Sequence, residues 1–279
     1  MGQTCASRAP TIEDILSLGP NKKDTSKIVI KGNHRSSHKI SRKSLSPLND
    51  HTNALLKEFF ESHQSSITEE VKVFYLKALK DESLAEINLK FKELSSSEVY
   101  YLGIVLPYFP KLTSLNLWKC NLGNSGIKEV SKALPSLPQL THLALEDNGI
   151  STKGFVYLAK AIKHLNQLKY LSLHCNVIDS EAARYLSCVL VFLEDLEGLY
   201  LDSTEMTSEA FIFFSRSLLR LRNLKFLGLA FNLLDGKVLP TLNNVLDKTA
   251  NLKELYLAGN EIPSLATILP LHPTIKIKI

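Results

Sequence analysis

The sequence predicts an α/β fold built from one repeated unit: a right-handed, curved solenoid with parallel strands on its inner side and helices on its outer side. Two observations lead to this prediction. The pattern L-x-x-L-x-L recurs seven times, with a constant step of 28 residues between successive starts. Each recurrence is followed by a stretch whose apolar residues have helical spacing. One strand and one helix per short repeat are typical of a stacked solenoid.

The first half of each repeat predicts a short strand. The seven motifs begin at Leu84, Leu112, Leu140, Leu168, Leu196, Leu224 and Leu252, and Ile87 replaces the second leucine of the first motif. Successive side chains of a strand point to opposite faces of the sheet. We therefore expect residues four and six of each motif to point into the core, and residues three, five and seven to point outward.

A short polar residue follows each strand at an interior position. It is Asn148, Asn176, Asn232 or Asn260 in four repeats, and Cys120 in the second repeat. Such a side chain satisfies backbone groups left unpaired where the chain turns away from the strand. Lys92 occupies this position in the first repeat, where an edge unit is open to water, and Thr204 occupies it in the fifth.

The second half of each repeat predicts a helix. Position 13 holds residues that we expect to be N-caps: Ser96, Asn124, Thr152, Ser180, Ser208 and Gly236. Apolar residues follow with helical spacing, such as Ile127, Val130, Leu134 and Leu137, or Phe211, Phe214, Leu218 and Leu221. One face of each helix is therefore expected to meet the core.

The two ends of the array need caps, because the terminal cores would otherwise meet water. Ile275, Ile277 and Ile279 alternate with polar residues, which predicts a terminal strand over residues 274–279. Residues 54–83 are expected to form the other cap, with a helix over 66–80 in phase with the repeats and a second one over 54–63. The repeat domain therefore spans residues 54–279.

Residues 1–53 form a basic tail that we expect to be disordered, because they are rich in Ser, Lys, Asn and Pro. Residues 1–50 hold nine Lys and Arg against four Asp and Glu, and this +5 equals the net charge of the whole chain. Residues 51–279 therefore hold 24 of each sign and are neutral. A neutral body argues against a nucleic-acid partner, which usually requires a basic face.

The segment Gly123 to Gln139 (GNSGIKEVSKALPSLPQ) and the 28-residue step resemble the ribonuclease-inhibitor-like class of leucine-rich repeats, over residues 84–279. The resemblance implies a protein-interaction module that acts as an adaptor, an inhibitor or a secreted bacterial effector. Activators of a small GTPase share this class, so a GTPase regulator is an alternative. The chain lacks their acidic C-terminal tail and ends in IKIKI, and it has no P-loop of the immune receptors in this class.

The outward columns of the inner strands are the predicted partner-binding surface. The candidate contact residues are Trp118, His142, Glu146, Tyr170, His174, Tyr200, Asp202, Phe226 and Tyr256. Large aromatic side chains outside a core are typical interface anchors. The alternative is that they pack sideways on one another as cross-strand neighbours.

Glu146, His174 and Asp202 fall in the same outward column on three neighbouring strands. They form either a metal site or a charge ladder in which the acids raise the pKa of the histidine. We favour the ladder, and we expect no metal, no cofactor and no enzyme activity. Cys175 is not expected to form a nucleophilic pair with His174, since the two point apart.

The N-terminal sequence MGQTCAS carries a lipidation hypothesis. Gly2 is a candidate for myristoylation and Cys5 for palmitoylation, and the basic residues that follow would attract anionic lipid. The alternative is a plain leader without lipid. No secretory signal and no spanning segment is recognisable, so we expect a cytoplasmic monomer (in the host cytoplasm for a bacterial effector) with at most weak membrane association.

Overall fold

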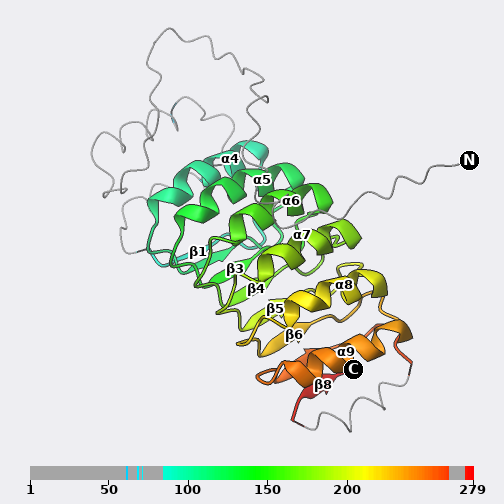
Figure 1. The fold of residues 1–279 in the computed structure, drawn as a ribbon. Helices are drawn as coiled ribbons and strands as arrows, with labels where there is room; N and C mark the ends of the chain where they lie inside the picture. Colours follow the sequence, from blue (N-terminus) through cyan, green and yellow to red (C-terminus); the bar gives the residue numbers. More distant parts are fainter. Residues whose placement is uncertain (1–60, 62–67, 69–70, 72–83, 264–273) are drawn as a thin grey trace, which may run out of the picture.

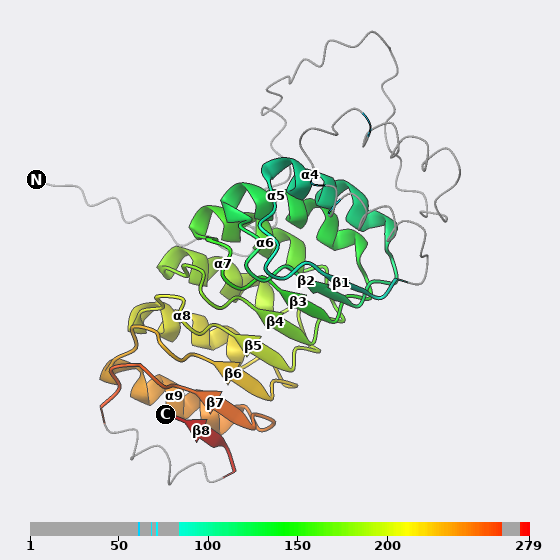
Figure 2. The ribbon, with the colours of Figure 1, turned by 180° about the vertical axis from the view of Figure 1, so that it is seen from behind.

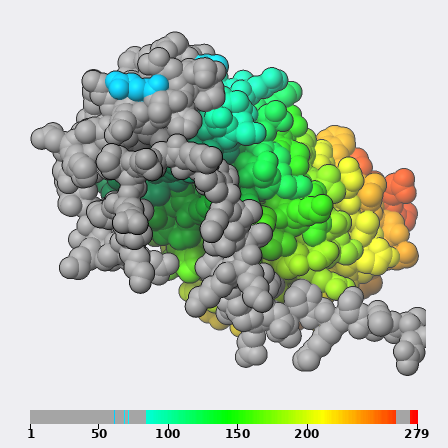
Figure 3. Space-filling view, turned by 90° about the horizontal axis from the view of Figure 1, so that it is seen from above, coloured from blue at the N-terminus to red at the C-terminus, as the bar shows by residue number. Residues whose placement is uncertain are grey.

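The structure is a computed structural model of the chain, and it describes residues 61, 68, 71, 84–263 and 274–279. Eight strands form one parallel sheet in sequence order, from β1 to β8. The helices lie along one side of this sheet, and the strands line the other side (Figures 1 and 2). The repeats follow one another in chain order, so the colours change steadily along the body (Figure 3). This is the α/β repeat solenoid that the sequence predicts.

Each repeat contributes one short strand, and most also contribute one helix of 10 or 11 residues. The strands are β1 (Glu86–Asn88), β2 (Ser114–Asn116), β3 (His142–Ala144), β4 (Tyr170–Ser172), β5 (Gly198–Tyr200), β6 (Phe226–Gly228), β7 (Glu254–Tyr256) and β8 (Lys276–Lys278). The helices are α4 (Ser96–Val105), α5 (Gly123–Ala133), α6 (Thr152–Ile162), α7 (Ser180–Leu190), α8 (Ser208–Leu218) and α9 (Leu239–Lys248). Short 3₁₀ turns are η2 (Leu106–Tyr108), η3 (Leu134–Ser136) and η4 (Gly236–Val238).

From β1 to β7 the register of the sheet has no slip, because each pair of neighbouring strands matches residues that are 28 apart. The last pair, β7 and β8, matches residues that are 22 apart, because the terminal unit is shorter. Leu143 pairs with Leu171, and Leu171 pairs with Leu199. Helices pack about 8–10 Å apart, whereas strands lie only about 4.8 Å apart. A stack of strand–helix units therefore spreads on the helical side, and the strand side becomes the concave one.

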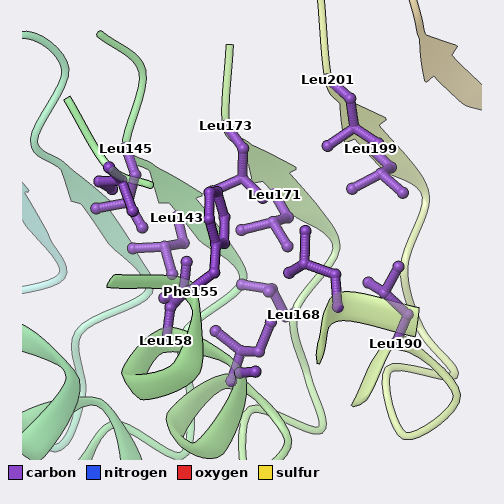
Figure 4. Packing of buried hydrophobic residues seen from close by; sticks show 14 of the residues in the cluster. Leu143, Leu145, Phe155, Leu158, Leu168, Leu171, Leu173, Leu190, Leu199 and Leu201 are labelled. Atoms are coloured by element: carbon purple, nitrogen blue, oxygen red, sulfur yellow. The ribbon is translucent and has the colours of Figure 1, made fainter. Parts of the chain in front are cut away.

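The core lies between the sheet and the helices. The fourth and sixth residues of every motif are buried, as predicted, including Leu143, Leu145, Leu171 and Leu173. Phe155 and Leu158 of α6 point toward these leucines from the helical side (Figure 4). The apolar helix residues named from the sequence are also buried. The spacing of apolar residues in the sequence thus determines which face of each strand and each helix packs into the core.

Asparagines at the interior position tie consecutive repeats together. Asn148 Nδ2 donates to the carbonyl oxygens of Leu117 and Leu145 at 2.8 and 3.0 Å. Its Oδ1 accepts from the backbone N–H groups of Cys120 and Leu122 at 3.0 and 3.2 Å. Donation to two carbonyls recurs at Asn176, Asn232 and Asn260. This confirms the role expected from the sequence.

The repeats without asparagine use weaker substitutes. Burial raises the pKa of Cys120 to about 11, so its thiol keeps its proton, and Sγ donates to the Leu89 carbonyl at 3.1 Å. In the fifth repeat the backbone carbonyl of Thr204 accepts the Ile178 N–H at 2.9 Å, in place of an asparagine oxygen. Lys92 is exposed, as expected for an edge unit.

The predicted N-caps were wrong by one residue, and by two in α5. The observed N-cap residues are Ser95, Leu122, Ser151, Asp179, Thr207 and Asp235. The position-13 residues already belong to the helices or, for Gly236, to η4, whereas Asp179 has an extended backbone and accepts from the N–H groups of Glu181 and Ala182. A capping oxygen must lie before the first helical residue to reach those donors.

A left-handed residue ends the strand segment of every repeat. The eighth position has φ between 49° and 71° in Phe91, Lys119, Asp147, Cys175, Ser203, Phe231 and Gly259. A Cβ atom on Gly259 would lie only 2.3 Å from Cδ1 of Phe231, so a side chain here would require the Phe231 ring to move, and glycine also adopts the left-handed conformation without strain. The sequence did not reveal the turn, because six of its seven residues are not glycine.

Both ends of the array show contacts that cover the terminal repeats. Glu98 accepts hydrogen bonds from the N–H and the hydroxyl of Thr68 at 2.9 and 2.8 Å, and Val71 is buried in the core. The rest of the expected cap over residues 54–83 lies outside the described residues, apart from Glu61. At the other end β8 pairs with β7 through Ile277 and Leu255, within the segment expected to form a terminal strand.

Candidate functional site

The outward side chains of the strands form a continuous surface that we call the strand face. It consists of the third, fifth and seventh residues of each motif together with Lys276 and Lys278 of β8. The nine candidate contact residues all belong to it, and none of them is fully buried. The strand face therefore has side chains available for contact, while the opposite sides of the same strands fill the core.

Trp118 is the most prominent apolar side chain of the strand face. It is 39% exposed, although its ring packs against Phe91 with 4.6 Å between the ring centroids. Phe91 is itself 55% exposed. Sequence reasoning missed Phe91, because the eighth position was not assigned to the outward columns. The left-handed turn carries its side chain back beside the tryptophan.

Two more aromatic pairs lie further along the sheet. His142 stacks on Tyr170 with 4.7 Å between ring centroids, and His174 stacks on Tyr200 at 5.6 Å. Each pair joins neighbouring strands. The sideways packing that the sequence left as an alternative is therefore present, and it leaves the rings half-exposed rather than buried. Burial raises the pKa of Tyr200, so its hydroxyl remains protonated at neutral pH.

His174 and Asp202 form a direct pair. Their Nδ1 and Oδ2 atoms are 2.9 Å apart, while Oδ1 of Asp202 accepts the Ala230 N–H at 2.7 Å. The carboxylate lies over Gly228, where a Cβ atom would be 2.3 Å from Oδ2. Both oxygens of Asp202 are therefore already engaged within the protein.

Glu146 differs from Asp202 although it lies in the same column. No hydrogen bond or ion pair of its side chain occurs among the described residues, and its Oε2 atom is buried without a partner. On the adjacent strand the hydroxyl oxygen of Ser172 is also buried without a partner. The predicted ladder thus joins only His174 and Asp202, and it leaves Glu146 unpaired.

Phe226 and Tyr256 lie toward the C-terminal end of the strand face. Both are half-buried. Nζ of Lys278 in β8 lies 4.2 Å from the centroid of the Tyr256 ring and 2.8 Å from Oε2 of Glu254. Hydrogen bonding to this lysine lowers the pKa of the Glu254 carboxyl. Tyr256 is therefore covered from one side by the chain itself, which makes it less accessible than Trp118.

The other chemical hypotheses concern metal binding, reactive cysteines and attachment to a membrane. Within residues 61, 68, 71, 84–263 and 274–279, no three His, Cys, Asp or Glu side chains lie together as a metal would require. Cys175 is exposed on the left-handed turn, and Cys188 on α7 is half-buried with a pKa raised by burial. No helix in the described part of the chain is long and apolar enough to span a membrane. Gly2 and Cys5 lie outside the described residues, so their lipidation stays a prediction.

The fold and this surface define a leucine-rich-repeat solenoid. A family model described as Leucine Rich repeat matches residues 110–131 and 137–159, which cover the strand and much of the helix in the second and third repeats. A search of curated proteins found no match. The family match supports a leucine-rich-repeat protein, a family whose members typically bind other proteins and typically are not enzymes.

Proposed function

We propose that the chain binds a protein partner on its strand face, around Trp118, Tyr170 and Tyr200. The observation that carries the proposal is the row of half-exposed aromatic rings on the strand face of the second to the fifth repeat, on side chains that lie outside the core. Tyrosine and tryptophan bury large areas with little loss of conformational entropy, and they dominate measured interface energies.

The lateral stacking supports this role rather than competing with it. His142 holds Tyr170 and His174 holds Tyr200, so neither tyrosine has to be ordered when a partner arrives. A preorganised side chain loses less entropy on binding than a free one. The strand face is therefore a rigid surface, suited to a folded partner or to an extended peptide.

The finer role that we propose is that of an adaptor or inhibitor working by binding alone, either as a host-cytoplasmic effector or in its own cytoplasm. The support is the combination of a repeat fold with an exposed contact surface and an unpaired acid on that surface. A regulator of a small GTPase remains the alternative, and such a partner would be recognised among the captured proteins.

The test starts with capture of partners from a cell lysate by the full chain, followed by affinity measurements with the partner that returns. Trp118→Ala and Tyr200→Ala should each weaken binding by about 2 kcal/mol, as truncation of an interface anchor does. Lys160→Ala on the helical face is the matched control and should bind like the unmodified protein. If both aromatic variants bind normally while Lys160→Ala loses affinity, the helical face is the working surface and the proposal is wrong.

A further inference from the structure

Two buried polar atoms without partners lie on neighbouring strands of the strand face: Oε2 of Glu146 and Oγ of Ser172. Ala144 pairs with Ser172 across β3 and β4, and Glu146 is two residues beyond Ala144 on the same face. The two atoms therefore belong to one small area. A buried polar atom without a hydrogen bond is rare and costly in a folded protein.

The other buried side-chain atoms without a partner in the described part of the chain belong to Ser131 in α5 and Asn243 in α9, both on the helical side of the sheet. Glu146 and Ser172 thus mark the place where, among the described residues, the strand face has buried polar atoms without a partner. Since one member is a carboxylate, the group that would satisfy it is a cationic donor.

The side walls of this area are aromatic. Trp118 precedes Glu146 by one repeat and His174 follows it by one repeat, in the same outward column. Two strand spacings, or about 9.6 Å, separate the backbone positions of Trp118 and His174. A flat group above the Glu146 carboxylate would therefore lie between these two side chains. His174 is fixed by Asp202 and Tyr200, and Trp118 is supported by Phe91.

We infer that this area binds an arginine side chain of the protein partner, with its guanidinium paired to Glu146 and flanked by the Trp118 and His174 rings. The inference rests on the proposed function and names the chemistry of the group recognised. A guanidinium is planar, carries five N–H donors and stacks on aromatic rings, whereas a lysine ammonium is a compact and strongly hydrated charge. Asp202 does not serve as the cation site, because its two oxygens are already hydrogen-bonded.

The test uses Trp118 as its own reporter, since it is the only tryptophan of the chain. The full-length protein is titrated with acetyl-Gly-Arg-Gly-amide, and the indole N–H resonance and the fluorescence of Trp118 are followed. The same peptide with lysine, or with the neutral isostere citrulline, serves for comparison. We expect a saturable response to arginine, a response to lysine that is at least about threefold weaker, and none to citrulline.

Glu146→Gln keeps the shape of the side chain and removes its charge, and it should weaken arginine binding by about tenfold or more. Glu205→Gln is the matched control, because Glu205 is an exposed acid on a turn of the fifth repeat. It removes the same charge and should change the affinity by less than about twofold. An equal response to citrulline, no saturable response to arginine, or normal binding by Glu146→Gln would each overturn the inference.

The partner captured for the proposed function separates the two ideas. A partner that loses affinity for Trp118→Ala but binds Glu146→Gln like the unmodified protein overturns the arginine inference alone. A partner that is insensitive to Trp118→Ala and Tyr200→Ala overturns the proposed strand face, whatever the peptide titration shows.

Discussion

The two sides of each inner strand differ in how much their residue types vary from repeat to repeat. Toward the helices, the fourth and sixth positions are Leu in every repeat except for Ile87, and all are at most 4% exposed. Toward solvent, the third position alone changes from Glu86 to His142 to Phe226. The difference shows that one side of a strand specifies the fold, while the other side is free to carry recognition.

The largest loss of stability is expected when a charged residue is placed on the inward side of a strand. Leu171 is fully buried between β3 and β5. Leu171→Asp places a carboxylate without a partner in that layer, at a cost comparable with the whole stability of about 5–15 kcal/mol. We expect the variant to be unfolded by circular dichroism at 25 °C, whereas Leu171→Met should lose less than about 1.5 kcal/mol. A cooperative transition of Leu171→Asp at the original temperature would contradict the assignment.

The second largest loss of stability is expected when an interior asparagine is replaced. Asn176→Ala removes three side-chain donations, to the carbonyl oxygens of Leu145, Leu173 and His174. It also removes the acceptor of the Asn148 and Ile150 N–H groups. Because these backbone groups are then buried without partners, we expect a loss of about 3 kcal/mol in a urea unfolding experiment. Asn166→Ala, an exposed asparagine of the same repeat array, should change the stability by less than about 0.5 kcal/mol. Equal losses in the two variants would show that the ladder does not stabilise the repeats.

A smaller, pH-dependent effect is expected where residue 68 meets the first repeat. Burial raises the pKa of the Glu98 carboxyl, but hydrogen bonds from Ser95 and Thr68 outweigh it, so the net pKa is lowered from its ordinary value of 4.5. A lowered folded-state pKa stabilises the protein above the unfolded value, and this stabilisation is lost as the pH falls through the folded value.

Glu98→Gln should therefore be less stable than the unmodified protein at pH 7, by about 1–2 kcal/mol. The difference in unfolding free energy between the two proteins should shrink as the pH is lowered below about 4. Urea unfolding of both proteins at pH 7 and at pH 3 measures this difference. A difference that stays the same at both pH values would mean that the carboxylate charge has no role in this contact.

The sequence predicted the fold well because the 28-residue period repeats the same pattern of buried and outward positions seven times. Leu143, Leu171 and Leu199 each occupy the same place in their repeats, so the register from β1 to β7 follows from one motif. Local details were harder. The N-caps were placed one or two residues late, because Thr207 and Ser208 are both good capping residues and only the backbone turn decides between them.

The strand face was predictable as a set of residues but not as an arrangement. Alternation alone identified Trp118, Tyr170 and Tyr200 as outward. It did not reveal that Asp202 would be engaged by His174 while Glu146, in the same column, would have no partner. Those outcomes depend on side-chain rotamers and on the left-handed turn after each strand, which no periodicity encodes.

The most direct test of the separation between folding and recognition uses two consecutive residues. Leu117 is fully buried and Trp118 is 39% exposed on the other side of the same strand segment. Unfolding free energy and affinity for the captured partner are measured for Leu117→Ala and Trp118→Ala. We predict that Leu117→Ala loses about 2–5 kcal/mol of stability, while Trp118→Ala loses less than about 1 kcal/mol of stability and at least about tenfold in affinity. A Trp118→Ala variant that is as destabilised as Leu117→Ala and yet binds the partner normally would contradict the account.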